Sequence, residues 1–199
     1  MTPVLNWYGM PVVLASQSPR RKEILDMIGI QYETCIPEYS ENNFSQDPPE
    51  ILVLQHAVRK AQAVAGSYPQ AWIIGADTIV VCNQNILGKP TTDSEAIQML
   101  KSLSGIEHRV LTGYCVLNSA NGRYLQNVVQ TRVIFKKLSL SEIKYYIENY
   151  HPLDKAGAYA IQDYSAIFVE KICGCFYNVV GFPLPAFYEQ VKKELRTCL

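Results

Sequence analysis

Apolar residues recur along the chain in two spacings, one typical of strands and the other of helices. Strand-like runs with flanking turn residues are predicted at Pro11–Ala15, Tyr32–Ile36, Trp72–Cys82, Arg109–Leu117, Tyr124–Phe135 and Ile167–Ile172. Helical spacing is predicted at Ser18–Gly29, Pro49–Ala65, Thr92–Gly105, Ser139–Tyr150 and Pro183–Leu195. Strands that alternate with helices predict an α/β fold, here a mixed twisted sheet flanked by helices.

Local signals fix several ends of these elements. Ser18 and Pro19 are typical of an N-cap followed by the first helical position. Ser139 and Glu142 have the spacing of a capping box, and Asn121-Gly122 predicts a tight turn between two strands. A polar segment, Pro37–Pro48, separates the second strand from the second helix and is expected to be a loop.

Charge and composition narrow the classes of function. Hydrophobic residues make up 48% of the 199 positions, enough for a buried core, and the formal net charge is +0. A chain without a basic face is not expected to bind long nucleic acids. Neither a charged signal-peptide start nor a membrane-length apolar run is present, and the six scattered cysteines suit reduced thiols, so we expect a cytoplasmic location with no membrane partner.

The first candidate site follows the first predicted strand, at Ser16–Arg21. Backbone N–H groups at a helix N-terminus can bind anions, and adjacent Arg20 and Arg21 add bidentate phosphate donors. Most surface arginines are merely solvated, but this position favours a phosphate-binding role.

The second candidate is Asp77, which lies within the apolar run Ile73–Val81. A buried carboxylate is costly unless it is paired or holds a metal. An Asp bonded to backbone at a strand bend is one interpretation, and a metal ligand or general base is the other. Glu41, in the polar loop, could supply a second hard oxygen ligand for Mg²⁺.

The third candidate is the segment Asp154–Gln162, which is expected to lead into a strand. Lys155 is a cation beside small residues, and Gln162 can both donate and accept along the edge of a base. Cations that hold phosphates and carboxylates that hold a metal are what phosphoryl-group hydrolysis requires. Taken alone, these residues indicate an enzyme with a phosphate-containing ligand.

Several motifs in fixed order make the chain resemble the Maf family of nucleotide pyrophosphatases. They cover all but about ten N-terminal residues, and they are Leu14–Arg21, Arg59-Lys60-Ala61, Gly75-Ala76-Asp77-Thr78, Gly88-Lys89-Pro90, Leu103-Ser104-Gly105, His108, Thr112-Gly113, Asp154–Gln162 and Val180–Leu184. The resemblance implies one domain over residues 1–199, with about 1–10 as an extension. It also implies an inosine-triphosphatase-like fold with a cleft between two lobes.

Two positions place the chain in one branch of that family. The branch that acts on dTTP and UTP has Asp-Thr after Gly-Ala and later Ala-Gly-x-Tyr-x-Ile-Gln, and Thr78 and Gln162 match it. The branch that acts on 7-methyl-GTP has Asp-Gln and Gly-Ser-Phe-Lys-x-Glu at these places. The resemblance therefore implies a dTTP/UTP pyrophosphatase that removes unwanted nucleotides, with a link to septum formation and cell division.

The resemblance also implies residue roles. Asp77 would be the catalytic carboxylate, and Arg20, Thr78 and Gln162 would set substrate choice. Glu41 and Asp77 would hold Mg²⁺ or Mn²⁺. The residues expected to line the triphosphate site are Ser16, Arg21, Lys60, Lys89 and Lys155.

Alternatives and departures remain at this point. A purine or non-standard triphosphate pyrophosphatase, or a nucleotide-binding septum regulator, would share many of these features. A homodimer is expected from the family, and the 11% aromatic content could supply an interface. His56 stands where the family usually has Leu, and both His56 and His108 are expected to pack or support other groups, not to bind ligands.

Overall fold

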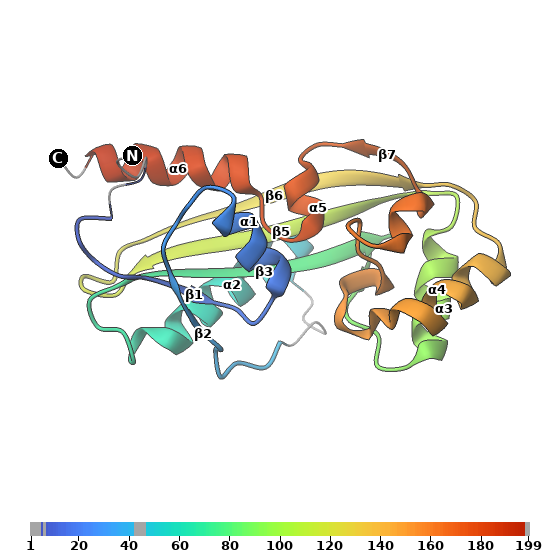
Figure 1. Cartoon of the computed structure of the whole chain (residues 1–199), viewed down its shortest axis with the longest axis horizontal. Helices are drawn as coiled ribbons and strands as arrows, with labels where there is room; N and C mark the ends of the chain where they lie inside the picture. Colours follow the sequence, from blue (N-terminus) through green and yellow to red (C-terminus); the bar gives the residue numbers. More distant parts are fainter. Residues whose placement is uncertain (1–4, 6, 42–46, 198–199) are drawn as a thin grey trace. The chain divides into compact units, whose positions relative to one another are not determined.

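A computed structural model describes residues 5, 7–41 and 47–197 of the chain. Its strands form one 7-stranded sheet with the order β2-β1-β3-β5-β6-β7, and β4 pairs with β3 (Figure 1). The strands are β1 (Val12–Ala15), β2 (Glu33–Cys35), β3 (Trp72–Cys82), β4 (Asn85–Leu87), β5 (Glu107–Asn118), β6 (Tyr124–Phe135) and β7 (Val169–Cys173). The helices are α1 (Pro19–Asp26), α2 (Pro49–Ala65), α3 (Asp93–Leu103), α4 (Leu140–Tyr150), α5 (Phe176–Val180) and α6 (Leu184–Thr197). The predicted mixed α/β sheet is confirmed, with β1 parallel to β2 and β3, and β4 and β7 antiparallel to their neighbours.

The chain divides into two compact units. Unit 1 comprises residues 1–77, 112–129 and 181–199, and unit 2 comprises residues 78–111 and 130–180. Strands β3, β5 and β6 contribute residues to both units. No helix among the described residues is both long and apolar enough to cross a membrane.

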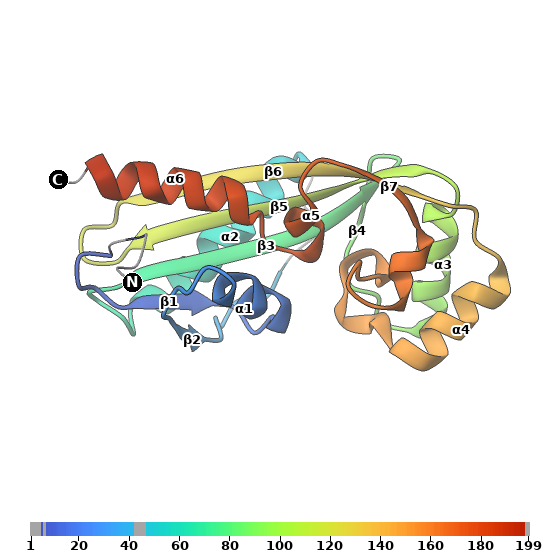
Figure 2. The same cartoon turned by 45° about the horizontal axis from the view of Figure 1, so that its top comes forward.

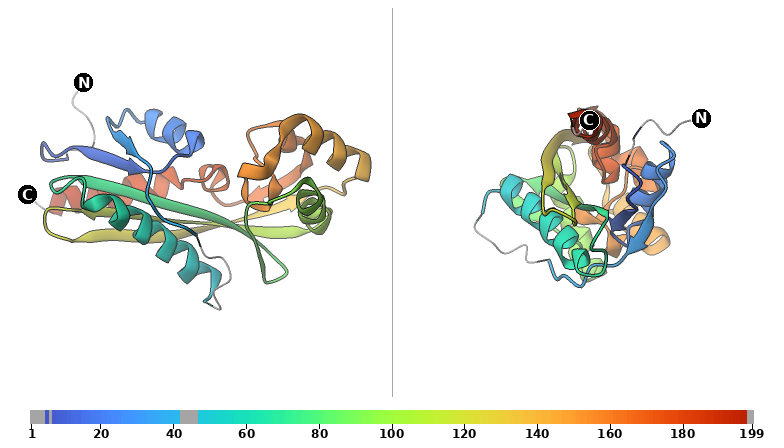
Figure 3. Two further views of the ribbon diagram at one scale, coloured as in Figure 1. Left: turned by 90° about the horizontal axis from the view of Figure 1, so that it is seen from below. Right: turned by 90° about the vertical axis from the view of Figure 1, so that its left-hand side faces the viewer.

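In unit 1, α2 and α6 cover opposite faces of the strands (Figure 3). Gly113 of β5 lies against α2, where a Cβ at that position would be 2.8 Å from the carbonyl oxygen of Val53. The next residue, Tyr114, packs against Phe187 of α6, with ring centroids 5.7 Å apart. Because neighbouring residues of a strand point to opposite faces, one short stretch of β5 supports both helices.

In unit 2, α3 and α4 pack on one apolar core (Figure 2). Leu100 of α3, Tyr146 of α4 and Phe135 of β6 are all buried in it. The capping box predicted for α4 is confirmed, since Ser139 Oγ accepts from Glu142 N–H and Glu142 Oε2 accepts from the Ser139 N–H.

The structure differs from the sequence predictions in a few details. The predicted strand Ile167–Ile172 corresponds to β7, which begins two residues later at Val169, and the residues before it, 154–168, form turns and short 3₁₀ segments. Asp163 and Ser165 explain this, because their side chains bond local backbone groups and so favour turns. Strand β4 and helix α5 were missed because each is short. Ser18 is the N-cap residue of α1, but its side chain makes no capping hydrogen bond.

Helix α2 approaches the sheet closely at Gly75 of β3. A Cβ there would lie 2.2 Å from the Ala57 carbonyl oxygen and 2.9 Å from the Ala61 nitrogen, both backbone atoms of α2. Only glycine allows this approach, and it sets how far α2 lies from β3.

We predict that Gly75→Ala destabilises the protein by about 1–3 kcal/mol, because α2 must move away from β3. Gly66→Ala is the matched control, since Gly66 has an ordinary φ of −62° and open space around it. Urea unfolding of both variants measures the difference. Equal free energies of unfolding for the two variants would show that the contact is not tight.

His108 of β5 gives a pH-dependent prediction. Its side chain is buried beside Tyr159, with Nε2 2.8 Å from the Tyr159 hydroxyl, and burial lowers its pKa from 6.5 to about 4. Below about pH 6.5 the unfolded chain takes up a proton on this histidine that the folded protein does not, so stability is lost as the pH falls towards 4. We expect the stability advantage of wild type over His108→Gln to shrink by at most about 3 kcal/mol between pH 8 and pH 4. Urea unfolding at several pH values measures it, and a constant difference would contradict the buried neutral state.

Candidate functional site

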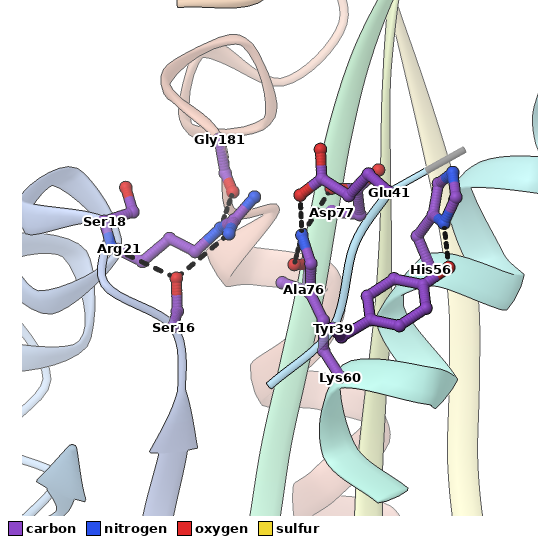
Figure 4. A network of polar contacts seen from close by, with 10 residues as sticks. All are labelled: Ser16, Ser18, Arg21, Tyr39, Glu41, His56, Lys60, Ala76, Asp77 and Gly181. Atoms are coloured by element: carbon purple, nitrogen blue, oxygen red, sulfur yellow. Dashed lines mark hydrogen bonds and ion pairs between the residues drawn. The ribbon is translucent and has the colours of Figure 1, made fainter. Parts of the chain in front are cut away.

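The carboxylate of Asp77 is the centre of the candidate site in unit 1 (Figure 4). Asp77 lies in the unbroken strand β3 and is 4% exposed, so the strand does not bend there as one interpretation supposed. Residues two apart on a strand share a face. Asp77 therefore lies on the same face of β3 as Gly75, which is the face that α2 covers.

Lys60 of α2 joins two carboxylates. Its Nζ donates to Asp77 Oδ1 at 2.7 Å and to Glu41 Oε1 at 2.5 Å, and its side chain is 9% exposed. Glu41 lies in the segment that follows β2, so three separate elements supply this cluster. The cation offsets part of the cost of burying two anions.

Burial raises the pKa of the Asp77 carboxyl above its usual value. The neighbouring Glu41 raises it further, while Lys60 and Arg21 act in the opposite direction. A carboxylate whose pKa is raised in a polar cluster can take up a proton during a reaction near neutral pH.

The cluster also suits a divalent metal. Asp77 Oδ2 is buried and has no hydrogen-bond partner among the described residues. Those residues contain no group of three or more His, Cys, Asp or Glu side chains that could hold a metal. Mg²⁺ commonly uses only one or two protein carboxylates and takes its other ligands from water and substrate phosphates, so Asp77 and Glu41 fit that ion.

A second polar group in unit 1 lies at the start of α1. Arg21 is 9% exposed, and its Nη1 donates to Ser16 Oγ at 3.1 Å while its Nε donates to the Gly181 carbonyl at 3.0 Å. Ser16 Oγ also accepts from the Ser18 N–H at 3.2 Å. Burial lowers the pKa of Arg21, and the nearby Asp77 and Glu41 charges oppose this. The predicted grouping of Ser16 and Arg21 is therefore observed, and Arg20 beside them is half-buried.

Unit 2 holds the remaining predicted site residues. The Gly157 N–H donates to the Gly88 carbonyl at 3.0 Å, which joins the loop of Lys89 to the loop of Lys155. Lys89 and Gln162 are exposed, and Lys155 donates to Asp154 at 2.6 Å.

Thr78 points to the opposite face of β3 from Asp77, because it is the next residue along the strand. It shares that face with Val80, and a Cβ at Gly157 would lie 3.0 Å from Val80 Cγ2. The segment that contains Gly157 and Gln162 therefore packs on the face of β3 to which Thr78 belongs.

Two contributions were missed by sequence reasoning. The Gly181 carbonyl anchors Arg21, although the two residues are 160 positions apart. The hydroxyl of Tyr39 lies 2.6 Å from His56 Nδ1, next to the carboxylate cluster. No local signal in the sequence indicates either contact, although the prediction that His56 supports other groups agrees with its position.

Comparison with known proteins finds several relatives that share one name. A dTTP/UTP pyrophosphatase of Geobacillus sp. (strain WCH70) is 47% identical, covering 92% of this chain and 97% of the relative. Proteins of the same name from Thermotoga maritima and Geobacter sulfurreducens are 46% and 42% identical, covering 93% and 92% of this chain and 90% and 95% of the relatives. Residues 11–194 match the family model of Maf-like proteins. Because this match spans nearly the whole chain, it shows that the chain belongs to the Maf-like protein family.

Proposed function

We propose that this protein is a nucleoside triphosphate pyrophosphatase that hydrolyses dTTP and UTP to the monophosphate and pyrophosphate. The structural observation that supports it best is the buried Asp77 carboxylate, with one oxygen paired to Lys60 and the other without a hydrogen-bond partner among the described residues. The relatives named dTTP/UTP pyrophosphatase, 42–47% identical, support the substrate class.

In the proposed reaction, the oxygen of a water molecule forms a bond to the α-phosphorus, and the bond from that phosphorus to the bridging oxygen of pyrophosphate breaks. Asp77 is proposed to accept the proton of the attacking water on a carboxylate oxygen. Arg21, Lys89, Lys155 and Lys60 are proposed to bind phosphate oxygens, and Ser16 holds the Arg21 guanidinium in place.

We propose that Asp77 and Glu41 hold Mg²⁺ or Mn²⁺. When bound, the metal would neutralise negative charge that develops on the pyrophosphate leaving group. Lys60 now lies between the same two carboxylates, so its ammonium group keeps them close together at a position suited to a cation.

Substrate choice is proposed to depend on Arg20, Thr78 and Gln162. Uracil and thymine present an acceptor, a donor and an acceptor along their pairing edge, and a Gln amide can match two neighbouring groups of that edge. Thr78 belongs to the face of β3 on which the Gly157 segment packs, and this supports a shared role with Gln162.

We further propose that residues 1–199 act as one catalytic domain, that the protein works in the cytoplasm and that it forms a homodimer. Tyr145 and Tyr150 of α4 are 50% and 40% exposed, and such side chains can supply apolar area to an interface.

Catalysis is tested with Asp77→Asn, which is nearly isosteric. We expect the turnover of UTP to fall on the order of a hundredfold or more, since the base and a metal ligand are lost together. The release of pyrophosphate from UTP measures this turnover. Circular dichroism should show an unchanged fold. A folded variant with near-normal turnover would refute the assignment of Asp77.

Base recognition is tested with Gln162→Glu, which removes a donor and places a charge facing a carbonyl oxygen. We expect kcat/KM for dTTP and UTP to fall roughly tenfold or more, with a smaller loss on a purine triphosphate. Gln70→Glu is the matched control, because it makes the same charge change at another exposed position. Equal losses on all triphosphates would mean that Gln162 does not read the base.

A further inference from the structure

The segment that carries Glu41 lies along α2 with alternate side chains turned inward. Pro37, Tyr39 and Glu41 are partly buried, whereas Glu38 and Ser40 are exposed. The paired part of β2 ends at Cys35, so beyond it the segment has no strand partner among the described residues. Side chains must therefore help to fix where Glu41 lies.

Two of the contacts between this segment and α2 have matching spacings along the chain (Figure 4). Tyr39 meets His56 at 2.6 Å, and Glu41 meets Lys60 at 2.5 Å. Two residues of an extended chain span about 6.6 Å, and four residues of a helix rise about 6.0 Å. The pairs 39/41 and 56/60 are therefore in register, one turn of the helix apart.

His56 is suited to hold the Tyr39 side chain in one position. It is 2% exposed, its ring lies 5.7 Å from that of Tyr39, and burial lowers its pKa. A neutral imidazole can accept a hydrogen bond from the Tyr39 hydroxyl at Nδ1, and it adds no positive charge beside a site that would bind a cation. A Leu side chain at this position could pack there but could not accept a hydrogen bond.

We propose that His56, through Tyr39, is a positioning residue that holds Glu41 beside Asp77 and so sets the affinity for the divalent metal. The proposal rests on the proposed metal-binding role of Asp77 and Glu41. Without the Tyr39–His56 contact, the segment retains the contact of Glu41 with Lys60. A metal that binds between the two carboxylates would compete with Lys60 for Glu41. The Glu41 side chain would then become ordered only when the metal binds, and this would lower the affinity for the metal.

The test measures Mn²⁺ binding to the nucleotide-free protein by electron paramagnetic resonance. We expect His56→Leu and Tyr39→Phe each to raise the Mn²⁺ dissociation constant by about tenfold, as loss of a group that orients a ligand does. The double variant should be no worse than either single variant, because both remove one interaction. His56→Asn, whose amide can accept from the Tyr39 hydroxyl, should largely restore binding.

Turnover gives an independent measurement. The Mg²⁺ concentration for half-maximal activity should rise in His56→Leu, while kcat at saturating Mg²⁺ stays within about twofold, since the reacting groups are unchanged. Tyr114→Phe is the control, because it removes another hydrogen-bonded tyrosine hydroxyl from unit 1, the one that bonds Gln190. It should leave both metal measurements unchanged.

The outcomes separate this proposal from the proposed function. If wild type binds Mn²⁺ and Asp77→Asn does not, but His56→Leu and Tyr39→Phe bind it normally, the positioning role is wrong and the metal site stands. If wild-type protein binds no Mn²⁺, both the metal site and the positioning role are overturned. A loss of affinity in His56→Leu that His56→Asn does not restore would indicate a packing effect and would also overturn the proposal.

Discussion

The contact of Lys60 with Asp77 and Glu41 is the constraint on which the candidate site depends. Two neighbouring carboxylates, one buried and one partly buried, repel one another and lose hydration, and one ammonium group at 2.7 and 2.5 Å offsets part of this cost. The contact joins β3, α2 and the segment after β2. A change in the position of any one of these elements would therefore alter the charge balance at Asp77.

The packing of α2 makes this contact possible. Gly75 lets the helix backbone approach β3, and Lys60 lies one residue before Ala61, whose nitrogen is among the atoms closest to Gly75. An interior position on a strand is normally a poor place for glycine, which weakens strands. Here the glycine allows the helix to come near enough for a lysine to reach a buried carboxylate two residues further along the strand.

The two faces of β3 meet different parts of the chain. Asp77 is turned towards α2 and the charged cluster, whereas Thr78 is turned towards the face on which the Gly157 segment packs. The period of two in a strand thus places Asp77 and Thr78 on opposite faces, although the two are adjacent in sequence. In the same way, Gly113 of β5 contacts α2, and the next residue, Tyr114, contacts α6.

The sequence by itself determined the strongly periodic elements and the family. The bounds of α2 and β3 agree with the predicted ranges, and the capping box of α4 was visible as Ser139 and Glu142, because these features depend on residues close together in the chain. Asp77 could be singled out because a charge within an apolar strand needs a local explanation. Only the tertiary structure decided what surrounds that charge. Lys60 lies 17 positions from Asp77 and 19 positions from Glu41, and Gly181 lies 160 positions from Arg21, which it contacts. Contacts between distant positions depend on how helices and strands pack, and hydrophobic periodicity specifies which face of an element is buried but not which side chain it meets.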